Sequence, residues 1–120
     1  MIDHIGFEVS DLARSARFYD AVFGALGARR MLDSERAVAY GINSPVVWIV
    51  MRGRGPGPDY GHLALQATGK AAVDAAYSAG LAAGGSDDGP PRRRPQYGPR
   101  YYAAYLLDPD RLRVEVVSRR

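Results

Sequence analysis

Two short segments of the chain, residues 3–9 and 61–67, repeat one another and contain both of its histidines. They read DHIGFEV and GHLALQA, and in each the polar and apolar positions alternate as in a half-buried β-strand. Alternation places every second side chain on the same face of a sheet. The two predicted polar faces consist of His4, Gly6 and Glu8, and of His62, Ala64 and Gln66. We therefore expect a fold built from two equivalent halves.

The first segment is followed by one helix and three further strands. Ser10 or Asp11 can cap a helix that Gly27 can end. Its apolar side chains recur at helical spacing, namely Leu12, Ala16, Tyr19, Phe23 and Leu26. The β-like stretches that follow are 29–33, 37–42 and 45–52.

The second segment is followed by the same order of elements. Thr68 is the expected cap of a helix that Gly84 and Gly85 end, with Val73, Ala76, Tyr77 and Leu81 on its apolar face. Residues 86–100 form a long predicted loop that holds a weak or irregular strand. Strands at 101–107 and 112–118 flank the predicted turn Asp108–Arg111.

The resulting pattern is βαβββ twice, which predicts an α+β fold. We expect one domain over residues 1–120, with the first repeat at about 1–53, a linker at 53–59 and the second repeat at about 60–120. Neither repeat is large enough to bury a sheet face alone, so the halves should pack or pair sheet to sheet, with a cleft between concave faces. The exposed edge strands also predict a homodimer.

Composition excludes several classes of protein. The chain has no cysteine, which rules out disulfides, zinc–thiolate sites and thiol nucleophiles. We expect a soluble, cytoplasmic protein without a membrane partner, because no apolar run approaches the ~20 residues that span a bilayer. The net charge is +3, and its one concentrated basic run, Arg92–Arg94, lies between prolines in a predicted loop. Nucleic-acid binding is not expected, since it needs a broader basic patch with stacking aromatics.

Three side chains suggest a metal site. Glu115 lies in a final strand whose neighbours are apolar, and a buried carboxylate costs several kcal/mol unless it is paired or coordinated. With His4 and His62 it makes a set of two imidazoles and one carboxylate, suited to Fe(II), Mn(II), Ni(II), Co(II) or Zn(II). The alternatives are ordinary histidines and a salt bridge from Glu115 to Arg113 or Arg119.

Three segments resemble the vicinal oxygen chelate superfamily. They are DHIGFEVSDL with the helix that follows it, GHLAL at 61–65, and LDPD with VEV near the end of the chain. This superfamily includes glyoxalase I, extradiol ring-cleaving dioxygenases, fosfomycin-resistance transferases and bleomycin-binding proteins. The resemblance implies a glyoxalase-like fold, metal ligation by His4, His62 and Glu115, and a small substrate chelated through adjacent oxygens. It also implies an active-site role for Tyr105, ten residues before Glu115.

Two positions depart from particular members of that superfamily. Trp48 aligns with the fourth metal ligand of glyoxalase I, and since an indole does not bind a metal, a true glyoxalase I is not expected. Trp48 is either a wall of the substrate pocket or a core residue. Extradiol dioxygenases use further histidines, and the nearest counterpart in the 86–100 loop is Gln96.

We therefore expect a metal-dependent enzyme of this superfamily, with a non-catalytic small-molecule binding protein of the bleomycin-resistance type as the alternative. Glu8 and Gln66 are candidates for proton transfer and hydrogen bonding, because they follow the histidines on the predicted polar faces. Arg100 and the basic run Arg92–Arg94 are candidates for attracting an anionic substrate, or are plain surface.

Overall fold

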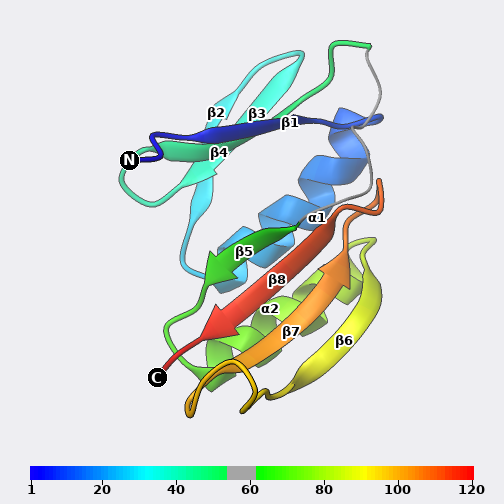
Figure 1. Ribbon diagram of the computed structural model, residues 1–120. Coiled ribbons are helices and arrows are strands. Elements are labelled where there is room, and N and C mark those ends of the chain that lie inside the picture. Colours follow the sequence, from blue (N-terminus) through cyan, green and yellow to red (C-terminus); the bar gives the residue numbers. More distant parts are fainter. Residues whose placement is uncertain (54–61) are drawn as a thin grey trace.

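The structure is a computed structural model that describes residues 1–53 and 62–120, and it contains two four-stranded sheets, each with its own helix (Figure 1). The first unit consists of β1 (Ile5–Glu8), α1 (Leu12–Ala25), β2 (Arg29–Asp33), β3 (Ala37–Gly41) and β4 (Pro45–Val50). The second consists of β5 (Leu63–Gln66), α2 (Lys70–Ala82), β6 (Ser86–Arg93), β7 (Tyr102–Leu107) and β8 (Arg113–Ser118). The predicted βαβββ repeat and α+β class are confirmed.

The two sheets have the same topology. The strand orders are β1-β4-β3-β2 and β5-β8-β7-β6, and the first strand of each unit pairs in parallel with the last. In each unit, the first and last strands in the sequence are therefore neighbours in the sheet. Most of the predicted linker, residues 54–59, lies outside the described residues.

Local sequence signals account for α1 better than for α2. Asp11 caps α1, with its carboxylate accepting a hydrogen bond of 3.1 Å from the Arg14 backbone N–H. The predicted Thr68 cap of α2 is wrong, because Gly69 occupies that position and makes no side-chain capping bond. Leu81, placed on the apolar face by its spacing, is 38% exposed.

The segment after α2 corrects a second expectation. Residues 86–93 form β6, which pairs with β7 through a register that shifts on both sides of Gly89. Arg92 and Arg93 therefore lie in a strand and not in a loop, and Arg94, expected at the surface, is buried. The irregular register lets an edge strand rich in glycine and proline keep its pairing.

The helices meet in the centre of the molecule, where α1 packs on α2. Gly80 permits this contact, since an added Cβ would lie 2.8 Å from Leu106 Cδ1 and 3.1 Å from Val22 Cγ2. The core comprises helix side chains and the sheet side chains facing them, including Phe18, Tyr19, Val22, Tyr40, Ile49, Val73, Leu106, Val114 and Val116. The alternate side chains of each strand therefore lie on a face turned away from the helices, called the open face below.

Polar contacts tie the two units together at the turn between β7 and β8. The Tyr19 hydroxyl of α1 donates to Asp108 Oδ2 at 2.7 Å, and burial raises the pKa of that carboxyl above its usual range. Arg14 pairs with Asp110 at 3.2 Å. Arg111 closes the turn with a φ of 71°, a left-handed conformation that costs a residue other than glycine roughly 1–2 kcal/mol.

Within the described ranges, no helix combines the length and apolar character needed to span a membrane.

Candidate functional site

Glu115 is the buried carboxylate of the second sheet. It lies in β8, between β5 and β7, and is 2% exposed. The register places it opposite Ala64 on one side and Tyr105 on the other. Its side chain therefore shares the open face with that of Tyr105.

Two groups hold the Glu115 carboxylate. His62 Nε2 lies 3.0 Å from Oε1, and the Tyr101 hydroxyl donates to Oε2. Burial and the neighbouring carboxylate raise the pKa of Tyr101 to about 12, so the phenol remains a donor at neutral pH.

The predicted arginine partners of Glu115 are engaged elsewhere. Arg113 donates from Nε to Asp88 Oδ2 at 2.8 Å, and the Arg119 guanidinium carbon lies 4.8 Å from the centroid of the Tyr101 ring. Glu115 therefore pairs with the second-repeat histidine instead of forming a structural salt bridge with arginine.

Tyr105 is clamped between two guanidinium groups on the same open face. The guanidinium carbons of Arg113 and Arg94 lie 3.9 Å and 4.7 Å from its ring centroid, and the His62 ring is edge-on at 6.4 Å. Burial is the main cause that raises the pKa of Tyr105, and Glu115 adds to it, while the two arginines oppose the shift. This arrangement holds a protonated phenol beside the His62–Glu115 pair.

His4 lies at the matching position of the first sheet. Its Nδ1 is 2.7 Å from Asp3 Oδ1, and its ring centroid is 6.3 Å from that of Trp48. Gly6 is the register partner of Trp48, so both aromatic rings belong to the open face of this sheet. Across residues 1–53 and 62–120, no three side chains of the histidine, aspartate and glutamate types converge within one chain.

The remaining predicted site residues are spread over the molecule. Glu8 is bonded to the backbone N–H of Arg52 and, at 3.2 Å, to its Nε, and so is held at the end of the first sheet. Gln66 lies at the exposed end of β5. Gln96 and Arg100 are exposed in the loop that joins β6 to β7.

Sequence reasoning missed Tyr101, and it named Arg94 only as part of a basic run, without predicting that Arg94 is buried. Both belong to a stretch rich in tyrosine and arginine, in which no spacing marks one side chain over the next. The hydrogen bond from Tyr101, directly before β7, to Glu115 of β8 is visible only in the folded chain.

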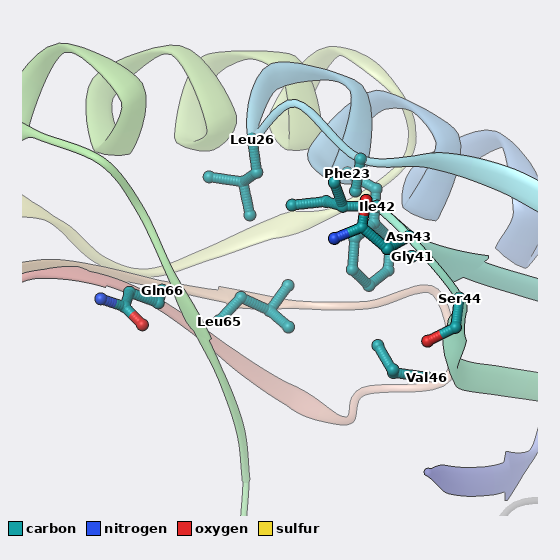
Figure 2. Close-up of a pocket in the computed structure, with 10 residues that line it drawn as sticks. Phe23, Leu26, Gly41, Ile42, Asn43, Ser44, Val46, Leu65 and Gln66 are labelled. Carbon is teal, nitrogen blue, oxygen red and sulfur yellow. The ribbon is translucent and has the colours of Figure 1, made fainter. Parts of the chain in front are cut away.

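An apolar groove of about 310 Å³ separates the C-terminal end of α1 from β5 (Figure 2). Figure 2 shows Leu26, Val46 and Leu65 around it, with Gln66 to one side. Ile42 and Val46 are 62% and 40% exposed, which makes this an uncovered apolar surface between the units.

The profile of the Glyoxalase/Bleomycin resistance protein/Dioxygenase superfamily matches residues 1–116. The chain therefore belongs to this superfamily, as the three sequence segments indicated. No curated protein matches the sequence significantly.

Solved structures share the fold over nearly the whole chain. A glyoxalase/bleomycin resistance protein from Albidiferax ferrireducens is 29% identical, with a TM-score of 0.85 and coverage of 98% of this chain and 97% of that one. A glyoxalase-related enzyme from Fulvimarina pelagi is 22% identical, with a TM-score of 0.77 and coverages of 98% and 87%. The fosfomycin resistance protein FosX from Mesorhizobium loti is 24% identical, with a TM-score of 0.72 and coverages of 98% and 91%. At these identities the last two show the fold alone.

Proposed function

We propose that this protein is a divalent-metal-dependent enzyme that acts on a small substrate chelated through adjacent oxygens. The observation that carries the proposal is the His62–Glu115 pair, in which a carboxylate that is 2% exposed meets an imidazole nitrogen at 3.0 Å. The donor set fits a divalent ion, because a buried carboxylate needs a positive partner and no arginine or lysine among residues 1–53 and 62–120 supplies one. The His62 side chain remains 42% exposed and is therefore accessible from solvent.

The third ligand in this proposal is His4 of a second copy of the chain. His4 and Glu115 lie on the open faces of two different sheets, and the helices that cover the other faces pack together within one chain. A twofold association that lays the first sheet of one copy against the second sheet of the other joins the two half-sites. The protein is then a homodimer with two identical sites.

We assign separate roles to the bound ion and to the residues around this site. A bound divalent ion supplies Lewis-acid stabilisation of charge on the chelated substrate oxygens. Tyr105, fixed by its two arginine neighbours, donates a proton or hydrogen bond to a substrate oxygen. Trp48, adjacent to His4, forms an apolar wall that excludes water, and this argues against glyoxalase I activity.

The apolar groove favours a second candidate function. A protein that only binds and sequesters a small molecule needs an uncovered apolar surface and no proton donor, and the groove beside Leu26 and Leu65 provides such a surface. Turnover separates the two functions. We expect product formation from at least one member of a panel of catechols, α-keto aldehyde–thiol adducts and epoxides, whereas tight binding of a ligand without turnover would favour sequestration.

Metal analysis tests the site itself. Purified protein supplied with Mn, Fe, Ni, Co and Zn should retain about one divalent ion per chain, and His4→Ala, His62→Ala and Glu115→Ala should each lose it, because two donors compete poorly with water. Asp33→Ala is the matched control, since it removes an exposed carboxylate of the first unit. Equal metal content in the wild type and all three ligand variants would refute the site.

A further inference from the structure

A second, smaller pocket lies beside the proposed metal site. It has a volume of about 120 Å³ and is lined by Gly98, Pro99, Arg100, Tyr101 and Arg119. The loop between β6 and β7 forms one wall, and the residue after β8 forms the other. This volume has room for one small polar group, such as a carboxylate or a phosphate.

The two arginines of this pocket lack counter-ions. Four arginines elsewhere, Arg14, Arg30, Arg52 and Arg113, are each paired with a carboxylate. In the described parts of the chain, neither Arg100 nor Arg119 has such a partner. The Arg119 guanidinium instead stacks on the Tyr101 ring at 4.8 Å, which fixes its plane and leaves its N–H groups for a ligand.

Tyr101 joins this pocket to the proposed metal site. The Arg119 guanidinium stacks on the Tyr101 ring, and the Tyr101 hydroxyl donates to the Glu115 carboxylate. A group bound in the pocket would therefore be separated from Glu115, a proposed metal ligand, only by the Tyr101 side chain.

We propose that the pocket binds an oxyanion group, a carboxylate, phosphate or phosphonate, through Arg119 and Arg100. Planar guanidinium groups match the geometry of such oxyanions and form charge-assisted pairs with them. This proposal names a substrate class for the proposed metal site, and to that extent it rests on the proposed function. The oxyanion belongs either to the chelated substrate or to a free ion.

Calorimetric titration of metal-free protein with inorganic phosphate tests the pocket. We expect Arg119→Gln to weaken phosphate binding at least tenfold and Arg100→Gln to weaken it less. Arg36→Gln is the matched control, because it removes one exposed arginine from the turn between β2 and β3. Arg119→Lys keeps the charge and should restore part of the affinity. Phosphate binding that Arg119→Gln changes no more than Arg36→Gln does would overturn the proposal.

Titration with 2-phosphoglycolate, which joins a phosphate to further oxygens, distinguishes the two sources. If the group belongs to the chelated substrate, Mn²⁺-loaded protein should bind this probe at least tenfold more tightly than metal-free protein, with phosphate affinity unchanged. Equal affinities with and without Mn²⁺, still lowered by Arg119→Gln, assign the pocket to a free anion. A wild-type protein that retains Mn²⁺ but does not bind phosphate refutes only the pocket, and a wild-type protein that binds phosphate but retains no Mn²⁺ refutes only the metal site.

Discussion

Trp48 lies on the open face of the first sheet, beside His4. It is half-buried on the open face, its ring is tilted by 58° toward that of His4, and its strand partner is Gly6. An added Cβ at Gly6 would lie 3.5 Å from Trp48 Cβ, an ordinary van der Waals contact, so the two residues are direct neighbours on this face. The sequence left two alternatives for Trp48, a pocket wall and a core residue, and its place on the open face is the reason to test the first.

Trp48→Glu tests this assignment. A carboxylate at this position adds a charged oxygen donor next to His4, so we expect tighter binding of Mn²⁺ or Zn²⁺ with little change in melting temperature. Metal titration and thermal melting of the variant and the wild type give the result. A fall in stability of several kcal/mol without any gain in affinity would identify Trp48 as a structural residue.

For single residues, burial could be predicted from the sequence more easily than the contacts that each side chain makes. The burial of Glu115 follows from its apolar neighbours, and the register then places it beside His62. The Tyr101 contact brings the residue before β7 to β8, and the burial of Arg94 brings the residue after β6 against β7. Contacts between segments that are far apart in the sequence leave no periodic pattern in it.

The elements show the same division between local and long-range determinants. Helix α1 and strands β2, β3 and β4 were predicted within two residues at either end, because caps and periodicity act locally. A weak or irregular strand is expected within the loop at 86–100, and β6 confirms it, but its bounds are not predictable because its glycine and prolines disfavour a strand and only β7 stabilises it. The contact of α1 with α2 has no sequence signal apart from a glycine inside α2.

Gly24 and Gly80 offer a matched test of that helix contact. Both lie inside helices, where alanine is more favourable than glycine by about 1 kcal/mol. Gly24→Ala should raise the free energy of unfolding by this amount, because no atom lies within 4 Å of the added Cβ. Gly80→Ala should lower it by about 1 kcal/mol, since the Cβ meets Leu106 and Val22 in the packed core. Chemical denaturation measures both, and equal gains would show that the helices adjust freely.

For the whole molecule, the internal repeat predicts two equivalent histidines but not where they meet. A cleft between two sheets was expected, and the open faces carry the expected side chains on separate sheets. Sequence alone leaves open whether the two faces meet within one chain or between two, because either pairing buries the same residues.

A mixed dimer resolves this question. The protein should elute at twice its 13.0 kDa chain mass at micromolar concentration. His4→Ala and Glu115→Ala copies should each lack metal, yet their mixed dimer should hold one ion, since one of its two sites receives an intact ligand from each copy. Unmixed dimers of each variant are the controls. A 13.0 kDa monomer that binds metal, or a metal-free mixed dimer, would contradict the shared site.

The parallel pairing of β5 with β8 also sets the order in which the site appears during synthesis. His62 leaves the ribosome well before Glu115, and β5 has no other strand to pair with in its sheet. Until β8 is inserted between β5 and β7, β5 has no paired neighbour in its sheet. The same holds for β1 until β4 has formed. The His62–Glu115 pair is therefore completed by the last strand of its unit, and it cannot form before the second sheet has closed.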